Sequence, residues 1–332
     1  MASQDTMATN IAGDFFLCDF FGAAPKGDLA SLEHPLFSLS TRPDRRVLDY
    51  IHNDVAVTIT PSVKGRATIH DKDILIFCIS QLVAALNAGR QISRRLTLTA
   101  HDLLVATGRE TSGDAYRRLK DAFERLAGTR ITTNIVTAEE ETTTGFGLIE
   151  SWEIVRRTRG GRMVSVSVTL SDWLYRAVCA RSVLTLSRDY FSLRKPLERR
   201  LYELARKHCG RQDAWVVSID TLLKKSGSAS PRRVFRAMVR EIIATDHVPD
   251  YHLMEISGDK IQVSPRESLV DRGERGGPVL PPEALEAARA LAPGSDVYAL
   301  EAQWRAYWAR SGRPALRSPQ AAFLGFVKKA RE

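Results

Sequence analysis

The chain has 332 residues, of which 44% are hydrophobic and 26% are charged, a composition typical of a globular protein with about two domains. Its formal net charge of +9 indicates an anionic polymer or surface as the partner. The cysteines lie far apart and form no CxxC pair, so we expect free thiols rather than disulfides or a zinc site. The N-terminus lacks a secretory signal, and the longest apolar run is too short to span a bilayer. These features predict a cytoplasmic protein with no membrane contact.

Common catalytic motifs are absent from the sequence. It contains no G-x-x-x-x-G-K-S/T phosphate loop, no H-E-x-x-H metal motif and no G-x-S-x-G nucleophile elbow. The histidines show no metal-ligand spacing. We therefore expect a protein that is not an enzyme, has no catalytic residues and needs no metal or cofactor. A nicking enzyme with a tyrosine nucleophile remains an alternative.

The N-terminal part of the chain, up to about Asn87, contains a segment without a period, a predicted sheet and a predicted helix. Residues 1–33 have no sustained period and form an N-terminal extension with an aromatic cluster between Phe15 and Phe21. Residues 50–63 alternate between apolar and polar side chains, which predicts a small sheet. An apolar helix then runs to about Asn87, and we expect Asp71 or Asp73 to cap it.

Residues 96–170 read as a short helix, a turn, a longer helix and a hairpin. Thr99 is placed to cap the first helix, and Ser112 or Thr111 the second. The hairpin strands are expected at 146–155 and 163–170, where β-forming residues are frequent. This order is typical of a winged helix, which is a variant of the helix-turn-helix motif. The second helix of that motif enters the major groove of DNA. We assign residues 34–190 to this domain, enlarged by the extra sheet.

Basic side chains lie on two parts of this first winged helix. The solvent face of the second helix is predicted to carry Arg117, Arg118 and Arg125, with Asp114 and Asp121 on the same face. This helix could read bases, position the duplex or form a dimer contact. The hairpin turn at Gly160-Gly161 is flanked by arginines, of which Arg159 and Arg162 are predicted phosphate contacts.

The same order of elements returns in residues 191–265. Pro196 begins a helix, a strand follows at 215–218, and a short helix ends near Lys225. Ser230 is placed to cap the next helix, with Pro231 in its first position, and a hairpin follows at 252–264. The predicted fold class is therefore α+β, with two tandem winged helices. A Gly- and Pro-rich linker at 266–282 leads to a small helical region at 283–332.

Positive charge is concentrated in the second winged helix. Residues 191–240 hold 13 Lys or Arg against 4 Asp or Glu, a surplus equal to the net charge of the whole chain. On a helical wheel Arg233, Arg236 and Arg240 form one stripe and Arg232 flanks it, with no carboxylate in the helix until Glu241. Because a solvated helix face normally mixes signs, this helix is the predicted main major-groove reader. Ser230 and Ser112, at the starts of the two reading helices, complete the predicted DNA-binding set.

Several ordered motifs resemble the plasmid replication initiator protein A family. They include Gly113-Asp114-Ala115-Tyr116, the later run from Gly147 to Trp152, and the stretches SLRKPLERRLYELARKHCG and SGSASPRRVFR. The resemblance covers about residues 30–265. It implies tandem winged helices that bind repeated origin sequences (iterons), open the duplex with a host initiator and replicative helicase, and repress their own gene as homodimers.

The leading hypothesis is therefore a sequence-specific double-stranded DNA-binding protein that initiates plasmid replication. The alternative is a winged-helix transcriptional regulator or autorepressor, which has the same fold and a different output. A tyrosine-dependent nicking initiator is the third hypothesis.

Overall fold

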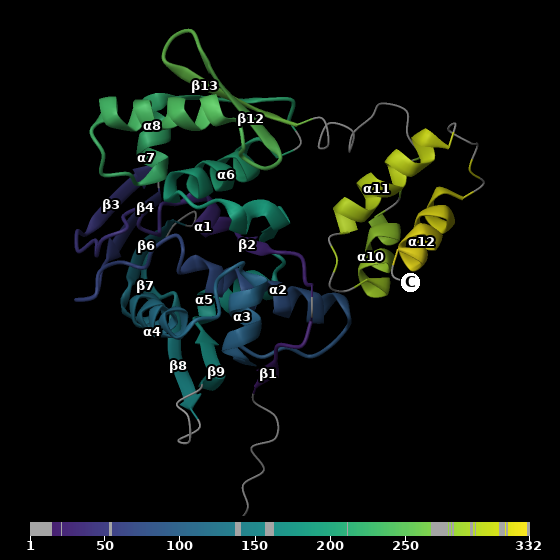
Figure 1. Cartoon of the computed structure of the whole chain (residues 1–332), viewed down its shortest axis with the longest axis horizontal. Helices are drawn as coiled ribbons and strands as arrows, with labels where there is room; N and C mark the ends of the chain where they lie inside the picture. The colour runs from purple at the N-terminus through teal and green to yellow at the C-terminus, as the bar shows by residue number, and fades with distance from the viewer. Residues whose placement is uncertain are drawn as a thin grey trace, which may run out of the picture.

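The computed structural model describes residues 15–20, 22–52, 55–136, 141–156, 163–210, 212–266, 278, 280, 282–292, 295, 297–311, 316 and 318–330. Figure 1 shows a main body with α8 at one end and β8, β9 and β1 at the other, and α10, α11 and α12 beside it. No described helix is long and apolar enough to cross a bilayer.

The first half of the main body is built on a four-stranded sheet. The elements in chain order are α2 (Lys72–Asn87), β5 (Arg95–Leu98), α3 (Ala100–Ala106), α4 (Gly113–Gly128), β8 (Ile149–Arg156) and β9 (Met163–Leu170). The strand order is β1-β5-β9-β8. β5, between the first and second helices, pairs antiparallel with β9, and the hairpin strand β8 lies outside β9.

The second half repeats this arrangement on a three-stranded sheet. Its elements are α6 (Pro196–His208), β11 (Trp215–Ser218), α7 (Ile219–Ser226), α8 (Arg232–Thr245), β12 (Tyr251–Ile256) and β13 (Lys260–Pro265). The strand order β11-β13-β12 is the order of β5, β9 and β8 in the first half. Each half therefore has a helix, a strand, two helices and a hairpin whose second strand pairs with the first strand.

A second four-stranded sheet covers the first half, in the order β3-β4-β6-β7. Its strands are β3 (Leu48–His52), β4 (Val55–Thr60), β6 (Arg130–Val136) and β7 (Glu141–Gly147). The prediction of one strand over 146–155 is wrong, because the chain changes sheets at Leu148. Leu148 is 1% exposed, so the break between β7 and β8 is anchored in the core.

The described part of the N-terminal segment packs on the main body. β1 (Phe16–Leu17) is parallel to β5, and β2 (Lys26–Asp28) pairs with β10 (Val183–Thr185). α1 (Leu29–Glu33), α5 (Asp172–Cys179) and the 3-10 helix η1 (Arg188–Ser192) complete this region.

Three apolar clusters stabilise the chain. One joins α2, α3, α4 and the sheets of the first half, and the second joins α6, α7, α8 and the sheet of the second half. The third holds together α10 (Pro282–Leu291), α11 (Val297–Arg310) and α12 (Pro319–Lys329) around Trp304 and Phe323. Helices were predicted for this C-terminal region, and the structure contains them.

Charged side chains at the start of α2 connect the two halves. Asp73 binds Arg109 of the α3–α4 turn at 2.9 Å and Arg199 of α6 at 2.5 Å, and Lys72 binds Glu203 of α6 at 2.7 Å. Asp71 stands at the N-cap position of α2, one of the two predicted, but its side chain makes no cap hydrogen bond with the described helix. Both carboxylates bind arginines from other elements instead.

Candidate nucleic-acid interface

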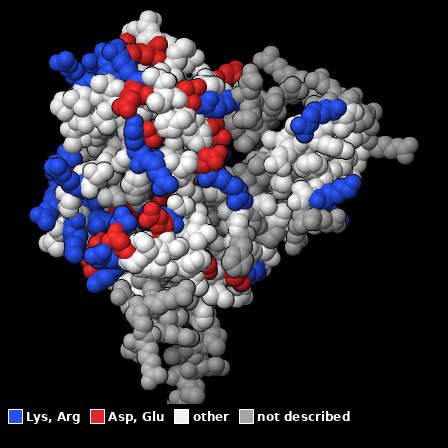
Figure 2. Space-filling view, in the orientation of Figure 1, with Lys and Arg blue, Asp and Glu red and all other residues white. Residues whose placement is uncertain are grey.

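Helix α8 presents basic side chains on the face opposite its buried one. Phe235, Val239 and Ile242 are buried, and the 3.6-residue period places the arginines on the outside. Figure 2 shows Lys and Arg side chains gathered near α8 at the top and near α4 below, with acidic groups among both. α4 follows α3, and α8 follows α7. Each is therefore the second helix of a helix-turn-helix, which is the position of the reading helix.

Three carboxylates from outside α8 bind its arginines. Asp220 of α7 accepts from Arg232 at 2.6 Å, and Glu255 of β12 accepts from Arg240 at 2.7 Å. Glu255 also accepts from Arg236 at 3.0 Å, and Asp259, in the hairpin turn, binds both Arg232 and Arg236. Hydrogen bonds from Arg240 hold the pKa of Glu255 below its usual range. The prediction of a stripe with no interleaved carboxylate therefore fails in the folded protein, although it holds within the helix.

Arg233 differs from its neighbours on α8. It is exposed, and its guanidinium has no ion pair or hydrogen bond with any residue that the structure describes. By contrast, the Arg236 side chain is 30% exposed beside its carboxylates. Arg233 is therefore ready to contact a partner without first giving up an internal ion pair.

Ser230 does not cap α8. The cap position belongs to Pro231, without a side-chain cap bond, and the helix begins at Arg232. Ser230 Oγ instead lies 4.0 Å from Met238 Sδ. The extended backbone of Pro231 moves the helix start one residue along, so the predicted assignment of this cap is wrong.

Helix α4 is placed as predicted at its start, where Ser112 Oγ accepts from the Ala115 N–H. Arg117 and Arg118 are 75% and 65% exposed, and both bind Asp114. Arg125 does not lie on the exposed face, which corrects the prediction. Its side chain is 22% exposed, and Nε and Nη2 donate to the two oxygens of Asp71 at 2.7 and 2.8 Å. The predicted phosphate contacts Arg159 and Arg162 lie outside the described residues.

Much of the charge surplus in 191–240 is internal. Arg199 and Arg200 have side chains 4% and 3% exposed, and Lys225 has 6%. Arg200 donates to backbone carbonyls of α1 and to Glu203, and Lys225 binds Glu33. Buried cations require partners of this kind, so residue counts in this segment overstate the positive charge that faces solvent.

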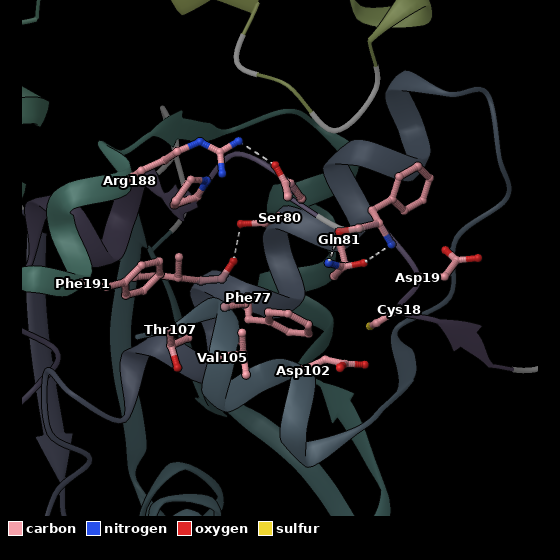
Figure 3. Close-up of a pocket in the computed structure, with 16 residues that line it drawn as sticks. Cys18, Asp19, Phe77, Ser80, Gln81, Asp102, Val105, Thr107, Arg188 and Phe191 are labelled. Atoms are coloured by element: carbon pink, nitrogen blue, oxygen red, sulfur yellow. Dashed lines mark hydrogen bonds between the residues drawn. The ribbon is translucent and has the colours of Figure 1, made fainter. Parts of the chain in front are cut away.

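A small apolar pocket of about 240 Å³ lies under the N-terminal segment. Figure 3 shows Gln81 of α2 bonded to the Phe20 backbone, with Phe77, Val105 and Phe191 around the cavity. Burial raises the pKa of the Cys18 thiol well above its usual range, so this cysteine is not a thiolate nucleophile. Among the described residues, no group of three or more His, Cys, Asp or Glu could hold a metal ion.

Comparison with known proteins shows the fold and the family of this chain. The fold is similar to that of domains 2 and 3 of RctB, with a TM-score of 0.53, 15% identity, and coverage of 72% of this chain and 97% of that one. The architecture is thus an α+β one also found in RctB. A family profile described as Replication initiator protein A matches residues 26–253.

A relative from Wigglesworthia glossinidia brevipalpis, provisionally named as a replication protein, is 36% identical over 244 residues. That alignment covers 72% of this chain and 88% of the relative. The chain belongs to the replication initiator protein A family.

Proposed function

We propose that this replication initiator is a sequence-specific double-stranded DNA-binding protein that starts plasmid replication at repeated origin sequences. The observation that carries the proposal is the repeated arrangement of helix, strand, two helices and hairpin. In each half, the third helix of that arrangement exposes arginines. We interpret the two halves as tandem winged helices, with α8 and α4 in major grooves of the same duplex.

Arg233 is the first candidate for base contact on α8, because it carries no internal ion pair among the described residues. Arginine bound to guanine O6 and N7 is the commonest specific contact in the major groove. Arg232, Arg236 and Arg240 contribute once DNA competes with Asp220, Glu255 and Asp259 for their guanidinium groups. On α4, Arg117 and Arg118 remain candidates, and Arg125 serves the fold.

Recruitment of a host initiator and replicative helicase, and self-repression as a homodimer, are further parts of the proposal that rest on family membership. We also propose that the protein has no catalytic activity of its own. A metal-dependent cut in labelled origin DNA, mapped by gel, would contradict this and support a tyrosine-dependent nickase.

The primary test is fluorescence anisotropy over a salt series, with the repeat DNA beside the gene and a scrambled duplex. We expect a large preference for the repeats and a steep log–log salt dependence. Arg233→Ala should weaken repeat binding by about 5- to 150-fold, which corresponds to ~1–3 kcal/mol for one bidentate base contact. Equal affinity of wild-type protein for both duplexes would contradict sequence-specific reading.

Arg310→Ala is the matched control, because Arg310 is an exposed helical arginine of α11 that also lacks an ion pair with the described residues. It should leave both affinities unchanged. Plasmid copy number in cells supplied with the protein and its repeats separates an initiator from the runner-up, a transcriptional regulator, which would leave replication unaffected.

A further inference from the structure

A groove of about 720 Å³ runs along one flank of α4. One wall is the α3–α4 turn and α4 itself, with Arg109, Ala115 and Arg118. Another part of the lining is the segment 40–43, and Arg194, just before α6, belongs to the second half of the body. The groove is therefore lined by both halves of the repeated arrangement.

Two cations of this groove are free to bind a partner. Arg42 and Arg194 are exposed, and neither guanidinium has a hydrogen bond or ion pair with any residue the structure describes. They stand beside Arg109 and Arg118, whose carboxylate partners are Asp73 and Asp114. Unpaired guanidinium groups at a groove wall favour an anionic ligand, and they suit phosphate in particular because they donate in a planar fork.

Arg66, which also belongs to the lining, adds an independent observation. Its side chain is 1% exposed, and its Nη2 donates to Asp44 at 3.0 Å. The Nε and Nη1 donors are buried, and neither has a hydrogen-bond partner among the residues that the structure describes. Buried donors without partners cost free energy. Acceptor oxygens of a ligand in the groove would supply these donors with partners.

The position of the groove indicates which phosphates it meets. A helix in the major groove, about 12 Å wide, has a sugar–phosphate backbone on each side. With α4 inserted through Arg117 and Arg118, the groove follows the flank where one of these backbones runs. Arg194 reaches the same groove from the second half, so one strand can contact both halves.

We propose that this groove is a binding site for the DNA backbone strand that borders α4, with Arg42 and Arg194 as phosphate contacts. The site deepens the proposed function and rests on it. Phosphate contacts supply affinity and orientation without reading bases. The groove therefore sets how tightly and in which register the duplex lies, and the exposed arginines of α8 and α4 supply the sequence preference.

The test compares the full-length protein with the double variant R42Q/R194Q by anisotropy, on repeat and scrambled duplexes over a chloride series. We expect both affinities to fall by the same factor and the log–log salt slope to become shallower by about 2, since each contact contributes ~0.9. R310Q/K328Q, which removes two exposed charges from α11 and α12, should change neither quantity. Unchanged affinity and slope in R42Q/R194Q would overturn the proposal, as would a loss confined to the repeats.

A further arm separates the possible causes. It titrates inorganic phosphate, without DNA, into wild-type protein and R42Q/R194Q by isothermal calorimetry at the same chloride concentrations, and we expect only weak binding. Tight phosphate binding by wild type alone, together with equal DNA affinity of wild type and variant, would show a site for a free phosphate compound and overturn the backbone assignment. If wild-type protein binds neither duplex, both the proposed function and the groove proposal fail. If wild-type protein prefers the repeats and R42Q/R194Q has the same affinities, only the groove proposal fails.

Discussion

Single buried charges at the start of α2 have a large effect on stability. Asp73 is 1% exposed and binds two arginines that come from different halves. Asp73→Asn keeps the volume but leaves Arg109 and Arg199 without a counter-charge, which costs about 3–5 kcal/mol in buried pairs. We expect a loss of that size in the free energy of unfolding, measured by urea denaturation.

The control for that measurement is Asp172→Asn, which removes the exposed partner of Arg176 on α5. Exposed pairs contribute less than about 1 kcal/mol. Equal losses in the two variants would show that the network at Asp73 does not stabilise the junction between the halves.

His70, in the lining of the groove, makes stability depend on pH. Burial, with Arg199 nearby, lowers its pKa from 6.5 to about 4, against the smaller effects of Asp73 and Asp71. Between pH 6.5 and pH 4 the unfolded chain therefore binds a proton that the folded chain does not, so acidification destabilises the fold. The loss amounts to about 3 kcal/mol at pH 4.

His70→Gln should remove this contribution. We expect the difference in unfolding free energy between wild type and variant to change by that amount between pH 7 and pH 4, measured by denaturant titration. A difference that stays constant with pH would contradict the assignment.

At the scale of elements, the β12–β13 hairpin places acidic side chains against the basic side chains of α8. Glu255 and Asp259 bind Arg232, Arg236 and Arg240, so in the proposed complex they would compete with DNA phosphates for these guanidinium groups. E255Q/D259N should therefore raise affinity for the scrambled duplex roughly tenfold at low salt and steepen its log–log salt slope by about 2. Affinity for the repeats should rise less, because base contacts already favour release of the carboxylates.

Fluorescence anisotropy on both duplexes measures the increase in affinity for each. D172N/E301Q, which neutralises two carboxylates paired with Arg176 and Arg305 far from α8, is the charge-matched control. An increase of the same size in the control would mean that net charge alone is responsible.

At the scale of the whole molecule, the C-terminal helices form a unit with their own core around Phe323. An exposed ion pair, Arg181 with Glu286 at 3.6 Å, and a small contact between α10 and α2 connect this unit to the main body. Removal of residues 279–332 should therefore change the unfolding free energy of the main body by less than about 1 kcal/mol and leave DNA affinity unchanged. A large loss of either would show that these helices support the reading surface.

The order and type of most elements follow from the sequence, because the signals that define them are local. These signals are the helical and strand periods, the glycines that end helices, and the serine or threonine caps. Thr99 and Ser112 cap α3 and α4 as predicted, and the chain order of both halves could be read without coordinates. The family could also be recognised from ordered motifs. The break between β7 and β8 was missed, because both segments have the same strand period and only burial of Leu148 separates them.

The candidate site was less predictable, and the reason is distance along the chain. Whether an arginine faces DNA or a carboxylate depends on which elements dock beside it. Glu255 lies 15 residues from Arg240, and Asp71 lies 54 residues from Arg125, so no helical wheel could reveal either pair. Composition and local pattern indicated a basic, two-part α+β protein, and the resemblance of its ordered motifs indicated the replication initiator family. Packing between distant segments determined which cations are neutralised, which are buried, and that Arg233, Arg42 and Arg194 have no ion pair within the described part of the chain.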